Sequence, residues 1–170
     1  MNIPNLLTTI RLLLVPVFGK LLYSDLYIES VIVLLISGLT DVLDGFIARK
    51  YNMVTNWGKV ADPFADKLMQ LTALLLLSVK KKIPFIIVII ILLKEIMMLI
   101  GTYILYTQDK LIVSANWYGK AATIIIYLVV VLIIFDTPHK TTLSIIAVIA
   151  ALFSFFMYMI NFLKIKFSRK

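Results

Sequence analysis

The sequence predicts an all-α integral membrane protein with about six transmembrane helices. Hydrophobic residues make up 62% of its 170 residues, and the mean hydropathy is +1.02, far above the values of soluble domains. A membrane-spanning helix needs about 20 mostly apolar residues, so this length holds about six spans and no separate soluble domain. The alternating pattern of a membrane β-barrel is absent. We therefore expect a single transmembrane domain over residues 1–170.

Six apolar segments account for most of the chain, and short polar or Pro-containing breaks separate them. The segments are Ile3–Tyr23, Leu26–Arg49, Val54–Val79, Ile83–Tyr106, Val113–Phe135 and Thr141–Leu163. The breaks are Ser24–Asp25, Tyr51–Asn52, Lys80–Lys82 followed by Pro84, Thr107–Lys110 and Asp136–Lys140. Helices are expected because they satisfy every backbone polar group inside lipid. The first segment could instead lie in the interface as an amphipathic helix.

The charge balance favours anionic partners and limits the available chemistry. Seventeen basic residues stand against nine acidic ones, which gives a net charge of +8 and favours lipid headgroups or phosphate-bearing substrates. No cysteine is present and His139 is the single histidine, so any metal chemistry must use carboxylates. A nucleic-acid-binding module is excluded by the composition.

Basic residues near the ends of the segments predict the orientation in the membrane. The side that holds both termini carries eight of them, against five on the other side. Because cytoplasmic loops are enriched in Lys and Arg, we expect a multi-pass protein of the cell membrane with cytoplasmic termini. The run Lys80–Lys82 argues the other way.

Four of the nine acids lie within 26 residues of the second and third segments: Asp41, Asp44, Asp62 and Asp66. At about 100° per residue, each pair falls on one face of its helix. The tight turn between the two helices allows these faces to oppose each other near the cytoplasmic end. Four unpaired carboxylates would repel one another, whereas one or two divalent cations with oxygen ligands, magnesium or manganese, would hold them ionised.

These residues form a motif that resembles the CDP-alcohol phosphotransferase family. The chain reads Asp41-Val-Leu-Asp44-Gly45-Phe-Ile-Ala48-Arg49, then eight residues, then Gly58-Lys-Val-Ala-Asp62-Pro-Phe-Ala-Asp66. This is similar to the family signature D-x2-D-G-x2-A-R-x8-G-x3-D-x3-D at every fixed position. The resemblance implies the six-helix bundle of that family, a homodimer, and transfer of a phosphatidyl or similar group from a CDP-linked donor to an alcohol with release of CMP.

The resemblance also implies roles for single residues. Asp41, Asp44, Asp62 and Asp66 would hold two divalent ions, and Asp66 would act as the base on the acceptor hydroxyl. The CDP donor would contact the following residues, several of which belong to the motif: Asn5, Thr8, Asp41, Asp44, Gly45, Ala48, Arg49 and Gly58.

The opening residues from Asn2 to Pro16, together with the stretch from Asp62 to Lys67, are similar to the bacterial phosphatidylglycerophosphate synthases of that family. This resemblance implies CDP-diacylglycerol as donor and glycerol 3-phosphate as acceptor. A dianionic acceptor needs cations, and four lie inside or at the edge of apolar segments: Arg11, Lys67, Lys94 and Lys120.

Other interpretations stay open at this point. Serine, inositol phosphate or phosphatidylglycerol could be the acceptor, and acids in membrane helices can also form the ion site of a cation transporter. Lys67 and Lys120 could simply extend toward the membrane surface. Lys94 could form a structural pair with its neighbour Glu95.

Overall fold

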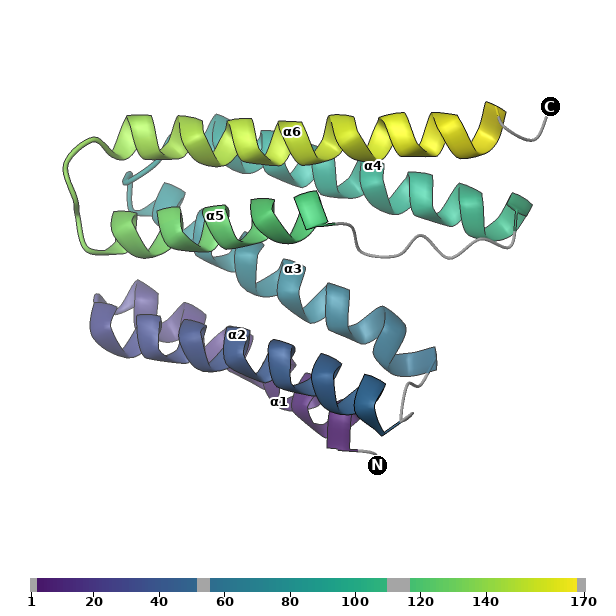
Figure 1. Ribbon diagram of the computed structural model, residues 1–170. Helices are drawn as coiled ribbons and strands as arrows, with labels where there is room; N and C mark the ends of the chain where they lie inside the picture. The colour runs from purple at the N-terminus through teal and green to yellow at the C-terminus, as the bar shows by residue number, and fades with distance from the viewer. Residues whose placement is uncertain (1–2, 52–55, 110–116, 168–170) are drawn as a thin grey trace. The chain divides into compact units, whose positions relative to one another are not determined.

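The computed structural model describes residues 3–51, 56–109 and 117–167, and all the regular secondary structure in these ranges is α-helical (Figure 1). The helices are α1 (Ile3–Tyr23), α2 (Tyr27–Lys50), α3 (Asn56–Val79), α4 (Phe85–Asp109), α5 (Trp117–Ile134) and α6 (Lys140–Phe167). The predicted all-α fold is confirmed, and each helix lies within a few residues of the predicted segment.

Five of the six helices are long and apolar enough to cross a membrane. These candidate spans are Asn5–Tyr23, Tyr27–Ile47, Phe85–Thr102, Trp117–Ile134 and Lys140–Lys164. The protein is therefore a multi-pass membrane protein. Helix α3, with 24 residues, is as long as the others at about 1.5 Å per residue. It is less apolar because Asp62, Asp66 and Lys67 lie in its first half, so its crossing of the membrane stays a prediction.

The chain forms two compact parts, residues 1–77 and residues 78–170. In the first part, α1 and α2 run antiparallel and side by side (Figure 1), and the turn between them contains Asp25 with a φ of 62°. Helix α2 buries Ser30, Ser37 and Asp44, which recur every seven residues and so share one face. Small side chains on that face allow neighbouring helices to approach closely.

Helix α3 contacts α1 through side chains. A Cβ atom added at Gly19 of α1 would lie 3.4 Å from Cγ2 of Thr72 on α3, which is ordinary van der Waals contact. The second, C-terminal half of α3 is apolar and buries Met69, Ala73 and Leu77. The first part of the chain therefore joins three helices, and the polar half of α3 lies at the same end as the start of α1.

In the second part, α6 packs against both α4 and α5 (Figure 1). The hydroxyl groups of Thr102 and Tyr158 are 2.7 Å apart, and Nδ2 of Asn161 donates to the hydroxyl of Tyr118 at 2.6 Å. A Cβ atom at Gly101 would lie 3.2 Å from the Tyr158 ring, so glycine makes room for this tyrosine. These polar contacts between helices add to apolar packing inside lipid.

Lysine side chains connect the loop before α4 with the loop between α5 and α6. Nζ of Lys82 donates to Oδ2 of Asp136 at 2.8 Å and to the carbonyl of Ile134 at 2.9 Å, and Lys140 also pairs with Asp136. The hydrogen bonds from Lys140 and Lys82 lower the pKa of Asp136. One lysine of the Lys80–Lys82 run therefore ties the loop before α4 to the loop before α6.

Candidate functional site

The centre of the candidate site is a buried arginine that pairs with two acids. Nη1 of Arg11 on α1 lies 2.5 Å from Oδ1 of Asp41, and Nη2 of the same residue pairs with Oδ2 of Asp44. Arg11 is 1% exposed, whereas the side chain of Asp41 is 44% exposed and that of Asp44 is 3% exposed. Asp44 follows Asp41 by three positions, which places the two acids on neighbouring turns of one α2 face. The planar guanidinium group can bind both at once.

Helix α1 also holds the first acid of α3. The hydroxyl of Thr8, which is buried, donates a hydrogen bond to Oδ1 of Asp62. Thr8 precedes Arg11 by three residues, so both side chains lie on one face of α1. One face of α1 therefore contacts acids of both α2 and α3.

The acids of α3 lie within electrostatic range of the acids of α2. The negative charges of Asp66 and Asp62 act on Asp41, and the charges of Asp62 and Asp41 act on Asp44. Asp62 and Asp66 are half-buried on α3. The structure thus brings the acids of α3 close to those of α2, and Arg11 pairs with the two acids of α2.

The residues present suit hard divalent cations by their chemistry. The four acids offer oxygen ligands alone, which magnesium and manganese prefer. Among the described side chains, no three acidic or histidine residues are grouped closely enough to hold one ion. Arg11 instead supplies positive charge to Asp41 and Asp44. A metal ion and Arg11 would therefore compete for the same carboxylate oxygens.

Of the other residues predicted to contact the CDP donor, some have side chains that the structure describes and others do not. Asn5 is half-buried on α1, and its carbonyl accepts a hydrogen bond from Oγ1 of Thr9 at 2.8 Å. Gly45 directly follows Asp44 on α2. The side chains of Ala48 and Arg49 and the surroundings of Gly58 lie outside the described side chains.

The four predicted acceptor cations belong to two different parts of the chain. Arg11 lies among the acids, and Lys67 is half-buried on α3 directly after Asp66. Lys94 and Lys120 belong to residues 78–170. Nζ of Lys94 lies 2.6 Å from Oε1 of Glu95, and their side chains are 6% and 7% exposed. Lys120 is exposed on α5. Contact between these two lysines and the substrate stays a prediction.

One buried polar residue of α3, Gln70, was not predicted as part of the site. Gln70 is 1% exposed, and neither Nε2 nor Oε1 of its side chain has a hydrogen-bond partner among the described residues. It follows Asp62 by eight residues and Asp66 by four, so it continues their helix face. That spacing, and a carboxamide in an otherwise apolar stretch, were the signals that could have revealed it.

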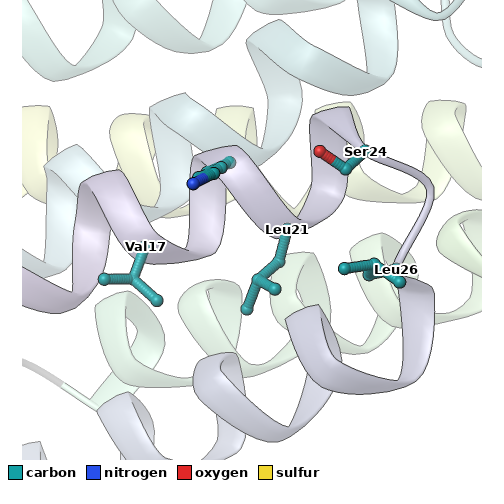
Figure 2. Close-up of a pocket in the computed structure, with 5 residues that line it drawn as sticks. Val17, Leu21, Ser24 and Leu26 are labelled. Carbon is teal, nitrogen blue, oxygen red and sulfur yellow. The ribbon is translucent and has the colours of Figure 1, made fainter.

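A separate hollow lies beside the turn between α1 and α2 (Figure 2). Its volume is about 450 Å³. The residues that line it are Val17, Lys20, Leu21, Ser24 and Leu26. Lys20 follows Arg11 by nine residues, or about 14 Å along the helix. The hollow is therefore at the opposite end of α1 from the acids and forms no part of the candidate site.

We expect Arg11→Met to destabilise the protein, because the substitution leaves Asp44 buried without its cation. Breaking one side of a buried ion pair typically costs about 3–5 kcal/mol. Adding Asp44→Asn to Arg11→Met should restore part of the loss. The measurement is the midpoint of thermal unfolding in detergent with a metal chelator present. Lys20→Met, an exposed cation of the same helix, is the control. An unchanged midpoint for Arg11→Met would contradict the structural role of the pair.

Comparisons with known proteins agree with the motif. A model of the family described as "CDP-alcohol phosphatidyltransferase" matches residues 1–160. The chain is 34% identical over 130 residues to a CDP-diacylglycerol--glycerol-3-phosphate 3-phosphatidyltransferase of Aquifex aeolicus, covering 75% of this chain and 72% of the relative. It is 32% identical over 137 residues to the protein of the same name from Bacillus subtilis, covering 72% and 70%.

A relative with another name is also similar. The chain is 34% identical over 131 residues to a cardiolipin synthase (CMP-forming) of Streptomyces coelicolor, covering 72% of this chain and 60% of the relative. Further relatives that share the first name are matched over about half of their own length. A cation transporter is no longer a viable interpretation. The chain belongs to the CDP-alcohol phosphatidyltransferase family.

Proposed function

We propose that this chain transfers the phosphatidyl group of CDP-diacylglycerol to glycerol 3-phosphate, which forms phosphatidylglycerophosphate and releases CMP. The observation that carries the proposal is the complete acid motif, in which Arg11 pairs with Asp41 and Asp44 and the charges of Asp62 and Asp66 act on Asp41. The names of the relatives from Aquifex aeolicus and Bacillus subtilis support this donor and this acceptor.

The depth of the acids suits a lipid donor. Asp44 lies six residues before the end of α2 at Lys50, and Asp62 lies six residues after the start of α3 at Asn56, or about 9 Å from each helix end. A headgroup can reach this level while its two acyl chains stay in the bilayer. With cytoplasmic termini, the site of this cell-membrane protein faces the cytoplasm, where a soluble acceptor enters from water.

The four acids have one shared proposed role as metal ligands. Asp41, Asp44, Asp62 and Asp66 would hold two magnesium or manganese ions, which would supply positive charge for the donor diphosphate. The CDP group lies against Asn5, Thr8, Gly45, Ala48, Arg49 and Gly58. Thr8 keeps Asp62 in position through its hydrogen bond.

The reaction requires one proton acceptor. The acceptor's hydroxyl oxygen attacks the phosphorus that bears the diacylglycerol group, and the bond from this phosphorus to the bridging oxygen breaks. CMP leaves with the electron pair of that bond. Asp66 takes the proton of the attacking hydroxyl, and its half-buried position on α3 leaves it open to the acceptor.

The phosphate of glycerol 3-phosphate needs positive partners because it is a dianion near other negative charges. We assign this role to Arg11, Lys67, Lys94 and Lys120. Arg11 has a spare donor, since its buried Nε has no hydrogen-bond partner among the side chains that the structure describes. A homodimer and contacts with membrane lipids complete the proposal.

Phosphatidylglycerol is a second candidate acceptor. The observation in its favour is the similarity to the cardiolipin synthase of Streptomyces coelicolor. The chemistry and the donor are the same, so the two candidates differ in the acceptor alone.

The wild-type protein in detergent should release CMP from CDP-diacylglycerol when magnesium or manganese and glycerol 3-phosphate are present. A panel with phosphatidylglycerol, serine and inositol phosphate tests the acceptor. EDTA should abolish the activity and added magnesium should restore it, because hard cations bind carboxylates. Release with another acceptor alone would contradict the proposed substrate, and full activity after exhaustive chelation would contradict the metal.

Asp66→Asn should lower turnover by about 10²–10⁴-fold, the usual contribution of a general base, while the variant still binds CDP-diacylglycerol. Asp41→Asn should weaken metal-dependent donor binding as well. The measurements are CMP release and donor binding for each folded variant. Asp25→Asn, which changes a loop acid at the far end of α1, is the control. Near-normal turnover of Asp66→Asn would remove Asp66 as the base.

Lys67→Ala should raise the KM for glycerol 3-phosphate about tenfold and leave the KM for the lipid donor nearly unchanged, because an ionic contact to the acceptor phosphate is lost. Lys50→Ala, an exposed lysine at the end of α2, is the matched control. Equal changes for both substrates would instead indicate that Lys67 has a structural role.

A further inference from the structure

The side chain of Gln70 is a buried polar group that the fold leaves unsatisfied. It is 1% exposed, and within the part of the chain that the structure describes both Nε2 and Oε1 lack a hydrogen-bond partner. Nearly all buried polar side chains in proteins have a partner, and an exception calls for an explanation. A carboxamide kept dry without partners destabilises the fold, so a ligand that supplies the partners is a natural explanation.

The position of Gln70 on α3 links it to the acids. At about 100° per residue, Gln70 lies about 40° around the helix from Asp66 and about 80° from Asp62. It is one turn, or about 6 Å, further along the axis than Asp66. Long side chains in helices lean toward the helix N-terminus, so its carboxamide leans toward the turn that carries Asp66. Gln70 thus borders the inner end of the acid cluster.

The chemistry of the carboxamide narrows the class of ligand. Its Nε2 donates hydrogen bonds and its Oε1 accepts them. A phosphate oxygen or an ester carbonyl only accepts, so either would leave Oε1 unpaired. A hydroxyl group can accept a hydrogen bond from Nε2 or donate one to Oε1. Two hydroxyl groups can therefore satisfy both atoms at once.

We propose that Gln70 is a specificity-determining residue that binds a second hydroxyl of the acceptor. This second hydroxyl is on the carbon adjacent to the one that bears the attacking hydroxyl. This inference rests on the proposed function, in which Asp66 receives the proton of the attacking hydroxyl. The neighbouring hydroxyl then lies one helical turn deeper, beside the carboxamide. The acceptor is therefore a vicinal diol, and a mono-alcohol of the same charge is a poor substrate.

The soluble and the lipid acceptors share this chemistry. Glycerol 3-phosphate and the headgroup of phosphatidylglycerol both carry a hydroxyl beside a terminal hydroxyl, whereas serine carries none. The preference for a diol is a property of the site that holds for either source, and the two sources are distinguished by testing each with its own deoxy analogue.

The test compares each diol with an analogue that lacks the second hydroxyl. The soluble pair is glycerol 3-phosphate and 3-hydroxypropyl phosphate, and the lipid pair is phosphatidylglycerol and phosphatidyl-1,3-propanediol. Wild-type kcat/KM from CMP release should be about tenfold higher for the diol of the pair that the enzyme uses, as expected for one or two hydrogen bonds. Gln70→Met keeps the side-chain length but loses both hydrogen-bonding atoms. It should lower kcat/KM for the diol to about the value of the analogue and leave the analogue unchanged.

Thr72→Val is the matched control, because it removes a polar group from α3 at a residue that contacts Gly19. It should keep the tenfold preference. An equal loss on diol and analogue in Gln70→Met would assign Gln70 to structure and overturn the inference. A change confined to the KM of CDP-diacylglycerol would overturn it as well, because it would place the carboxamide on the donor.

Thermal unfolding separates this inference from the proposed function. Saturating glycerol 3-phosphate should raise the unfolding midpoint of the wild type more than 3-hydroxypropyl phosphate does, and the difference should vanish in Gln70→Met. If the wild type releases no CMP with any acceptor, the proposed reaction fails, and these midpoints still judge the diol site. Equal midpoint shifts by the two phosphates in the wild type, combined with equal kcat/KM values for both pairs, would overturn the diol preference.

Discussion

The need to neutralise carboxylates inside a membrane protein governs the arrangement of α1, α2 and α3. A charged side chain within a span costs several kcal/mol unless it is paired, and α2 buries Asp44 at 3% exposure. Arg11 meets this need by binding both Asp44 and Asp41. Because Thr8 on the same face of α1 binds Asp62, this one helix holds the acids of α2 and the first acid of α3. The same contacts that hold the three helices together thus assemble the site.

The two halves of α3 differ in polarity and in role. Its first half carries Asp62, Asp66 and Lys67, and its second half buries Met69, Ala73 and Leu77. The apolar half anchors the helix in the fold through large buried side chains, and the polar half packs through Ala61 and Ala65 while it presents its acids. This division lowers the hydropathy of α3 relative to the five clearly apolar helices. Gln70 lies at the boundary between the two halves, where a polar group can still reach the acids.

Local patterns predicted what depends on local spacing. The six helices and the two acidic faces followed from hydrophobic periodicity, since residues three and four apart share a face. Contacts between distant residues were not accessible in this way. Arg11 was expected beside the acceptor phosphate, but the structure pairs it with Asp41 and Asp44, more than 25 residues away in the sequence. The spacing of Gln70 after Asp62 and Asp66 was a local signal, but its burial and its lack of a hydrogen-bond partner among the described side chains, which make it unusual, required the structure.

Charge balance explains why a motif of four acids serves a protein whose substrates are anions. With Arg11 alone, the four carboxylates keep an excess of three negative charges and would repel a diphosphate. With the two proposed divalent ions bound, the same cluster carries one positive charge and attracts the donor. The pairing of Arg11 with Asp41 and Asp44 then has a second consequence. It stabilises the acids when no metal ion is present, and any ion that binds these two residues frees the guanidinium group for an anion. One arginine can therefore act as the counter-ion of the acids in the resting protein and as a phosphate ligand in the loaded one, so its pairing with the acids is compatible with the role predicted from the sequence.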